Sequence, residues 1–142
     1  MYYFPKIITP AETLEGLEKS LYESEAAVNT VERKIIEEIS ALQNVKWWHR
    51  IAESKPYSFN INGFITHYLD FFVMTEKGTL VVVEVKGDDR DNSDSERKLR
   101  LGRKWAERAG DYFRYYMVFD KLNWSKEGAF DLSDFVELMK RL

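Results

Sequence analysis

The sequence predicts a mixed α/β fold in which helices flank a central four-stranded sheet. Residues 68–86 show an alternation with a period of two along both halves of the segment. They are also rich in β-branched and aromatic residues, and both features are typical of paired strands. Residues 29–43 place apolar side chains at helical spacing. Residues 112–119 form a nearly continuous apolar run after a second helical segment. A helix between two strands favours a parallel crossover, so we expect both parallel and antiparallel pairs.

Length and composition indicate one folded domain over residues 1–142. The chain is 44% hydrophobic and 15% aromatic, which is typical of a globular protein. It contains no cysteine, which excludes disulfides and thiolate metal sites and fits a reducing, cytoplasmic environment. No apolar run approaches the roughly 18 residues of a membrane span, so no membrane partner is expected. The net charge of −3 gives no global attraction to nucleic acid, although the 21 Lys and Arg residues could cluster on one face.

The first 28 residues are expected to lie outside the core, as an N-terminal arm and a short helix. Residues 11–23 place leucines at i, i+3 and i+7, which predicts a packing helix. The better helix, residues 29–43, begins with Asn29 as N-cap and has Glu32 three residues later, which is the pattern of a capping box. Glu32 falls within the apolar arc of that helix. Either the capping box holds this carboxylate, or the helix packs on the sheet and directs it towards a site there.

The segment before the hairpin carries no assigned chemistry. We expect the two tryptophans of residues 45–51 to pack in the core and at its rim, and we read His49 and Arg50 by default as a surface pair that could touch a phosphate. Residues 57–62 alternate cleanly, which predicts a half-buried strand towards an edge of the sheet.

The hairpin brings together the strongest candidate site. Residues 76–78 form its turn, with a glycine at the position that favours the left-handed conformation. Counting back along both strands from this turn places Asp70 opposite Glu84, and Lys86 lies two residues further on the same face.

Two opposed carboxylates repel each other, and a divalent cation would resolve the repulsion. Mg²⁺ and Mn²⁺ prefer such oxygen ligands, and a neighbouring lysine can position a water or neutralise developing charge. This set of groups suits the hydrolysis of a phosphodiester. The alternative is a charge cluster of Asp70, Glu84 and Lys86 on a solvated sheet edge.

A second helix is predicted over residues 94–109, opened by a capping box from Ser93 to Glu96. Lys98 projects into its apolar arc, either as a lysine whose stem covers apolar surface or as a second cation near the reacting phosphate. Gly102 on the same helix allows another element to approach closely.

Gly110 is expected to end that helix. Residues 112–119 then form a strand parallel to one strand of the hairpin. The last segment, residues 120–142, contains a C-terminal helix that starts at the pair Asp131 and Asp134.

The resulting order of helix, three strands, helix and strand resembles the core of the PD-(D/E)XK nuclease superfamily. The segment VERKII is similar to the first-helix signature of archaeal Holliday-junction resolvases. The segments NVKWWHR, NGFITHYLDFFV, VVVEVKGDD and GRKWAERAGDYFRYYMVF resemble the C-terminal endonuclease domain of type III restriction enzyme subunits and related DEAD/DEAH-box helicases. The likeness covers residues 29–119. One departure is Leu69, where the family usually has proline before the aspartate.

The resemblance implies a restriction-endonuclease-like αβββαβ core and Mg²⁺-dependent hydrolysis of DNA, with Mn²⁺ able to substitute. Lys86 would position or activate water, and Lys98 would orient the phosphate. The metal ligands that it implies are Asp70, Glu84, the backbone carbonyl of Val85, and Glu32. It also implies that the chain is part of a longer protein with a helicase or ATPase motor domain, and that a modification subunit is a possible partner.

Two other functions remain open on the sequence. One is a catalytically inactive domain that keeps the nuclease fold and binds DNA or acts as a scaffold. The other is an enzyme that acts on RNA or nucleotides with the same site. A basic face around Lys86 and Lys98 would favour DNA cleavage, whereas a narrow neutral pocket would favour a small substrate.

Overall fold

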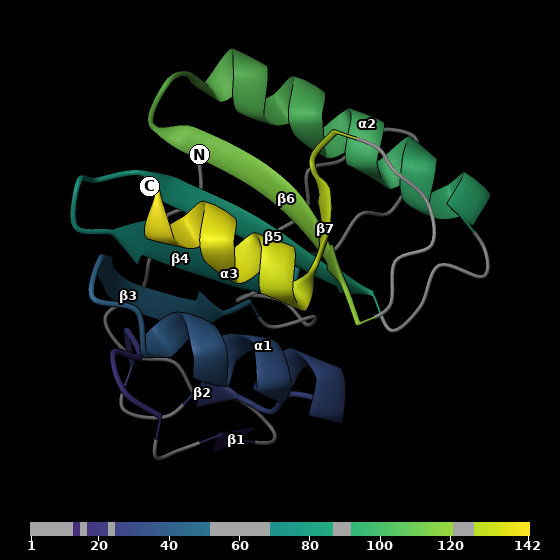
Figure 1. The fold of residues 1–142 in the computed structure, drawn as a ribbon. Coiled ribbons are helices and arrows are strands. Elements are labelled where there is room, and N and C mark those ends of the chain that lie inside the picture. The colour runs from purple at the N-terminus through teal and green to yellow at the C-terminus, as the bar shows by residue number, and fades with distance from the viewer. Residues whose placement is uncertain (1–12, 15–16, 23–24, 52–68, 87–91, 121–126) are drawn as a thin grey trace.

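The computed structural model describes residues 13–14, 17–22, 25–51, 69–86, 92–120 and 127–142. Within these residues the chain has an α/β architecture built on a five-stranded mixed sheet with the strand order β3-β4-β5-β6-β7 (Figure 1). The strands are β3 (Val45–Arg50), β4 (Phe71–Thr75), β5 (Leu80–Lys86), β6 (Phe113–Phe119) and β7 (Ala129–Asp131). The β3, β4 and β5 strands pair antiparallel, and β6 and β7 continue the sheet in parallel with β5.

Three helices cover the two faces of this sheet. Helices α1 (Thr30–Ser40) and α3 (Leu132–Lys140) lie together over one face, and α2 (Asn92–Ala109) lies over the other, along β6 (Figure 1). The sheet is therefore buried on both sides, which explains why its central strands are apolar in nearly every position.

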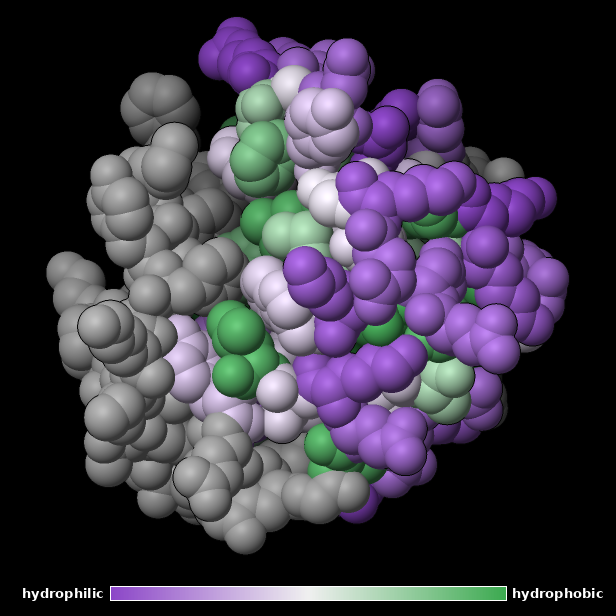
Figure 2. All heavy atoms as spheres, turned by 90° about the vertical axis from the view of Figure 1, so that its left-hand side faces the viewer, coloured by the Kyte–Doolittle hydropathy of each residue, from purple (hydrophilic) through white to green (hydrophobic). Residues whose placement is uncertain are grey.

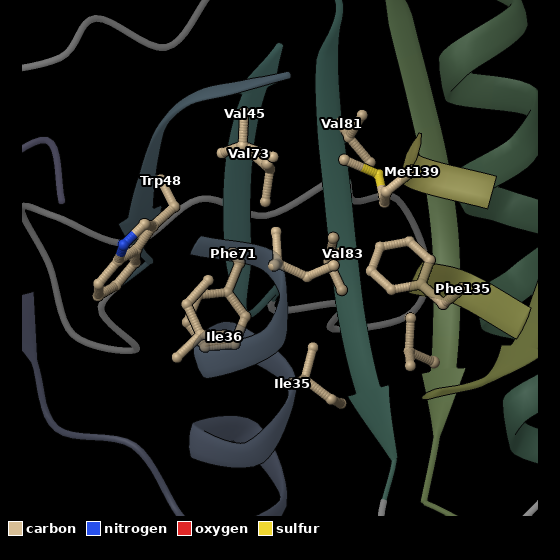
Figure 3. Packing of buried hydrophobic residues seen from close by; sticks show 12 residues of the cluster. Ile35, Ile36, Val45, Trp48, Phe71, Val73, Val81, Val83, Phe135 and Met139 are labelled. Carbon is tan, nitrogen blue, oxygen red and sulfur yellow. The ribbon is translucent and has the colours of Figure 1, made fainter. Parts of the chain in front are cut away.

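Each face of the sheet has its own hydrophobic core. Under α1 and α3, isoleucines of α1 pack against Phe71 and Val83, and Phe135 of α3 packs beside them (Figure 3). Under α2, the core is formed by Phe72, Val82 and their neighbours. Adjacent residues of one strand thus point into different cores, as the pleat requires.

The hairpin has the predicted register. Met74 lies opposite Leu80 and Phe72 lies opposite Val82. Gly78 adopts a φ of 90°, the left-handed conformation that the three-residue turn requires. The paired register ends at Phe71 and Val83. Just beyond it, the backbone N–H of Asp70 donates a hydrogen bond of 3.1 Å to the carbonyl oxygen of Val83, so the pairing of Asp70 with Glu84 lies outside the regular register and stays a prediction.

The predicted helix ends are largely confirmed. Asn29 caps α1, and its side chain and that of Glu32 form the reciprocal capping box. Asp131 caps α3 by accepting a hydrogen bond of 3.0 Å from the backbone N–H of Asp134. Gly110, with a φ of 110°, follows the last residue of α2. The capping box proposed at Ser93 is wrong, because α2 begins at Asn92 and Ser93 is already helical.

The number and identity of the strands differ from the prediction. The sheet has five strands among the described residues, whereas four were expected. The first strand is β3, a segment expected to provide only packing side chains, and the short β7 was not expected. The predicted strand at residues 57–62 and the N-terminal arm at residues 1–9 lie outside the described residues.

The predicted helix at residues 11–23 is wrong. Thr13–Leu14 (β1) pairs antiparallel with Glu25–Ala26 (β2). Lys19 has a φ of 62°, which a right-handed helix does not allow. Its carbonyl oxygen accepts a hydrogen bond of 3.0 Å from the backbone N–H of Trp48, at the outer edge of β3. Pairing with this sheet edge has therefore overridden the local helical pattern.

The described part of the surface gives no sign of a membrane-spanning element. No helix in the described ranges is long and apolar enough to cross a bilayer. Figure 2 shows the end of the molecule at which the β4–β5 turn lies. Hydrophilic side chains dominate the coloured part of this face, and hydrophobic atoms are visible between them only in small areas.

Candidate active site

The opposite end of the β4–β5 hairpin gathers charged side chains from both faces of the sheet. Asp70 immediately precedes β4, and Glu84 and Lys86 lie among the last three residues of β5. Helix α1 adds a residue from one side and α2 adds one from the other. The six charged residues of this cluster are Glu32, Arg50, Asp70, Glu84, Lys86 and Lys98.

Asp70 is anchored through both of its carboxylate oxygens. The backbone N–H of Val85 donates to Oδ2 at 2.7 Å, and Nη1 of Arg50 donates to Oδ1 at 3.1 Å. The Asp70 side chain retains 16% exposure, so it lies at the boundary between the core and solvent. Because the first of these bonds comes from the neighbouring strand, the hairpin itself fixes the orientation of the carboxylate.

Arg50 was expected to be a surface residue, and this expectation is wrong. Its side chain is only 7% exposed, and its guanidinium lies 5.6 Å from the centre of the Phe71 ring. In the sheet register Arg50 is paired with Phe71, which belongs to the core under α1. Arg50 therefore approaches Asp70 from the α1 side.

Glu32 completes this half of the cluster. Its Oε2 lies 3.3 Å from Nη2 of Arg50, and its Oε1 accepts a hydrogen bond of 2.9 Å from the backbone N–H of Asn29. The capping box predicted for Glu32 is therefore confirmed, and the same side chain also contacts Arg50 of the cluster, while its role as a metal ligand stays a prediction. Arg50 links Glu32 and Asp70 by contacting both.

Glu84 and two lysines form the other half, on the α2 side. Nζ of Lys86 lies 3.3 Å from Oε1 of Glu84, and Nζ of Lys98 lies 3.9 Å from the same oxygen. The Glu84 side chain is 3% exposed, whereas the lysines are about one fifth exposed. Lys98 thus extends from the apolar side of α2 to the Glu84 carboxylate, while its role as a cation near the phosphate stays a prediction.

Tyr115 of β6 is a site residue that the sequence did not single out. Its hydroxyl donates a hydrogen bond of 2.6 Å to Oε2 of Glu84. Burial raises the pKa of Tyr115 well above its ordinary value, and the negative charge of Glu84 raises it further. The phenol therefore stays protonated and holds the Glu84 carboxylate as a hydrogen-bond donor.

Gly102 makes room for this tyrosine. A methyl group added at Gly102 would lie 2.4 Å from the Tyr115 ring, far inside van der Waals contact. The close approach that the sequence suggested at this glycine is confirmed, and the element that approaches is β6.

Gly102→Ala is expected to lower the free energy of unfolding by about 1–3 kcal/mol, because overpacking forces Tyr115 to move. Urea unfolding of the single variant and of Gly102→Ala in a Tyr115→Ala background measures the effect. In the second background the ring is absent, so the same substitution should be neutral or slightly stabilising through helix propensity. Equal costs in both backgrounds would show that the contact with the ring is not responsible.

The acidity of Asp70 is shifted by its surroundings. Burial raises its pKa from the ordinary value of 3.8 to about 7, and the charge of Glu32 adds to the rise. The Val85 N–H and Arg50 act in the opposite direction without cancelling the effect. In the metal-free protein the negative charge of Asp70 is therefore incompletely compensated.

This pKa makes the stability of the metal-free protein depend on pH. The folded protein keeps the Asp70 proton up to about pH 7, whereas the unfolded chain releases it near 3.8. The stability that the neutral carboxyl provides is therefore full below pH 3.8 and is lost as the pH rises to about 7. Relative to Asp70→Asn, wild type should lose about 2–3 kcal/mol of unfolding free energy between pH 5 and pH 8, measured by urea titration with EDTA. If the unfolding free energies of the two proteins changed in parallel with pH, the raised pKa of Asp70 would be contradicted.

Asp70 and Glu84 carry the kind of oxygen donors that a hard divalent cation prefers. No group of three or more His, Cys, Asp and Glu side chains is arranged to hold a metal ion within the described ranges. However, Mg²⁺ needs only one or two protein carboxylates and otherwise keeps its waters. Asp70 and Glu84 remain the predicted pair of this kind, and a bound cation would offset the burial that raises the pKa of Asp70. Glu32 and the Val85 carbonyl remain predicted ligands, and both oxygens of Glu32 already contact protein donors.

A second buried polar network lies behind the site. Glu25 accepts hydrogen bonds from the backbone N–H groups of Tyr22 and Arg50, at 2.9 and 3.0 Å. Its Oε1 also lies 2.7 Å from Nδ1 of His49, which is fully buried. The expectation that His49 lies at the surface is therefore wrong. This network fixes the backbone from which Arg50 reaches Asp70.

Comparisons of the chain with protein-family models, with curated proteins and with solved structures find no match. The functional assignment therefore depends on the geometry of the site and on the sequence motifs.

Proposed function

We propose that this chain is a metal-dependent nuclease domain that hydrolyses DNA phosphodiester bonds. The observation that supports this most strongly is the charged cluster at the end of the hairpin, where Asp70 accepts a hydrogen bond of 2.7 Å from the backbone N–H of Val85 and Lys86 lies 3.3 Å from the Glu84 carboxylate. The order of α1, β3, β4, β5, α2 and β6 also agrees with the αβββαβ order of a restriction-endonuclease-like core. In this proposal β4 and β5 supply the motif carboxylates and α1 supplies Glu32.

The proposed mechanism assigns a separate task to each residue. Asp70 and Glu84 would hold Mg²⁺, or Mn²⁺ in its place, which would polarise a phosphate oxygen and lower the pKa of a bound water. Lys86 is partly exposed beside Glu84, where its ammonium can position an attacking water. Lys98 approaches from α2 and can orient the phosphate.

Two residues support the carboxylates without contacting the substrate in this proposal. Arg50 holds Asp70 from the α1 side, and Tyr115 holds Glu84 from β6. Such outer partners orient ligands and limit their motion, and they typically affect metal affinity by 10–100-fold.

Cleavage of supercoiled plasmid DNA in Mg²⁺ and in Mn²⁺ tests the proposal. Wild type should nick the plasmid, EDTA should stop the reaction, and Lys86→Ala should lose it. Lys77→Ala, an exposed lysine in the turn at the far end of the same hairpin, is the matched control and should cleave like wild type. If wild type is inactive in both metals, independent nuclease activity is refuted.

One observation favours a catalytically inactive DNA-binding or scaffolding domain as the second candidate. The site contains three acidic and three basic side chains, and both Asp70 oxygens already accept hydrogen bonds from protein groups. Such a cluster can be stable without a cation. DNA binding without cleavage, unchanged by Asp70→Asn, would support this candidate.

The longer-range expectations rest on the sequence resemblance. They are a helicase or ATPase motor domain in the same full-length chain, a modification subunit as a further partner, and a cytoplasmic location. If the isolated chain binds metal and DNA but does not cleave, it should be assayed joined to such a motor domain. Cleavage by the joined protein would show that the site needs the motor domain, and no cleavage would show that the site is inactive.

A further inference from the structure

The exposed side of α2 bears a row of four cations, which we call the α2 basic stripe. Its members are Arg97, Arg100, Lys104 and Arg108, and all four are exposed. At about 100° per residue, these positions fall within an arc of about 80° on the helix. The row is about 16 Å long, since the helix rises about 1.5 Å per residue.

The charges of the α2 basic stripe are not neutralised by described residues. None of the four side chains forms an ion pair within the part of the chain that the structure describes. Other exposed cations do form such pairs, such as Arg33 with Glu37 and Lys140 with Glu137. Arg103, on the flank of the stripe, is paired with Glu127. The stripe is thus a local concentration of positive charge on a chain with a net charge of −3.

The remaining sides of α2 are already occupied. Leu99 and Trp105 pack into the core beneath the helix, against β5 and β6. Tyr112 is the exposed large hydrophobic residue among the described residues, and it lies beyond the end of α2. The stripe therefore faces solvent as a charged surface without an apolar component.

The stripe begins at the candidate site. Arg97 is adjacent in sequence to Lys98, whose ammonium lies 3.9 Å from Glu84. From there the row runs along α2 towards Arg108, away from the carboxyl end of β5. A polymer that enters the site could therefore continue along the helix with its charges facing these cations.

We propose that the α2 basic stripe binds the phosphate backbone of the nucleic acid that enters the Asp70–Glu84 site. This inference rests on the proposed function and adds the surface that holds the substrate. Duplex DNA carries a regular row of phosphates along each strand, so a row of cations about 16 Å long can contact several phosphates at once. The contacts are electrostatic and confer no base specificity.

Two other polyanionic partners fit the surface less well. Stable binding to an anionic membrane by a surface helix requires an apolar face to insert, and the apolar face of α2 is buried in the core. An acidic protein partner normally contributes its binding energy through buried aromatic or aliphatic anchors. The pocket beside Arg100 and Lys104, about 360 Å³ in volume, is lined by charged side chains with Leu99 as its apolar member, so it offers little apolar surface for such anchors.

The test compares two variants with the same change in net charge. In the first, the four stripe residues become glutamine, as Arg97→Gln, Arg100→Gln, Lys104→Gln and Arg108→Gln. In the control, four exposed cations elsewhere become glutamine, as Arg33→Gln, Lys46→Gln, Lys77→Gln and Lys140→Gln. Fluorescence anisotropy with a labelled duplex, recorded in EDTA at several salt concentrations, measures binding without cleavage.

The stripe variant should bind the duplex at least about tenfold more weakly than wild type, and the slope of log K against log salt should become shallower by about 3–4. The control should retain affinity within about twofold. A triple variant with lysine at the three arginine positions should keep most of the affinity, because the contact depends on charge. Circular dichroism should show the same helix content in every variant.

Equal loss in the stripe variant and the control would overturn the inference, as would binding of phosphatidylserine vesicles through the stripe in place of DNA. Failure of the proposed function is a separate result, recognised by the absence of plasmid cleavage and of Mn²⁺ binding in wild type. DNA binding that depends on the stripe, in a wild type that does not cleave, would leave the stripe assigned and refute the nuclease activity alone.

Discussion

Replacing Asp70 by asparagine, or Glu84 by glutamine, is expected to lower metal-dependent DNA cleavage by about 10³-fold or more. A catalytic metal contributes several kcal/mol to transition-state stabilisation, and each loss of about 1.36 kcal/mol is tenfold in rate. Because the two carboxylates hold one cation together, the double variant should be no slower than the worse single variant. Steady-state nicking rates at saturating Mg²⁺ measure this non-additivity.

The matched controls for these substitutions are Asp111→Asn and Glu37→Gln, which change the same chemical groups at exposed positions. Both should cleave at the wild-type rate. Multiplicative losses in the double variant, or comparable losses in the controls, would show that the carboxylates do not act as one metal site.

Arg50→Gln is expected to lower the free energy of unfolding by about 3–5 kcal/mol at pH 8 in EDTA, as is typical when one partner of a buried ion pair is removed. Arg50 contacts both Glu32 and Asp70, and its positive charge lowers the pKa of Asp70. Without it, two buried carboxylates face each other with less compensation. The loss should be smaller at pH 5, where Asp70 is protonated.

Arg33→Gln is the control for this experiment. Arg33 also pairs with a glutamate of α1, but both side chains are about half exposed, so the substitution should cost less than about 1 kcal/mol. Urea titrations of both variants at pH 5 and pH 8 measure these losses in the free energy of unfolding. A cost for Arg50→Gln that matches this control would contradict the buried role of Arg50.

Local sequence signals were sufficient for several parts of the fold. The turn at residues 76–78 determines the hairpin register between Phe71 and Val83, and Asp70, one residue before β4, contacts the backbone of Val85 on the neighbouring strand. The capping box at Asn29 and Glu32 places the start of α1 for a similar reason, since both partners lie within four residues.

Sequence patterns did not predict the elements whose structure depends on partners far away in the chain. Residues 45–50 show no alternation, because β3 has buried side chains on both faces, so its strand character depends on pairing with β4. The segment near Lys19 pairs with Trp48, about thirty residues away, and this pairing replaces the expected helix. A three-residue strand such as β7 is too short for periodicity to reveal.

The two supporting residues of the site were missed for the same reason. Arg50 lies in a strand twenty residues before Asp70, and nothing in the local pattern distinguishes it from a surface cation. Tyr115 lies within an apolar run and is thirty-one residues from Glu84. The available signal for Tyr115 was Gly102, which indicated a close approach without identifying the residue that makes it.

The most direct test of the central claim is a titration of the chain with Mn²⁺ followed by electron paramagnetic resonance, because metal binding can be measured whether or not the isolated chain turns over. We predict specific binding to wild type, weakened at least about tenfold by Asp70→Asn and by Glu84→Gln and unchanged by Glu37→Gln. Binding of equal strength in all four proteins, or no specific binding to wild type at millimolar Mn²⁺, would contradict the assignment of Asp70 and Glu84 as a metal site.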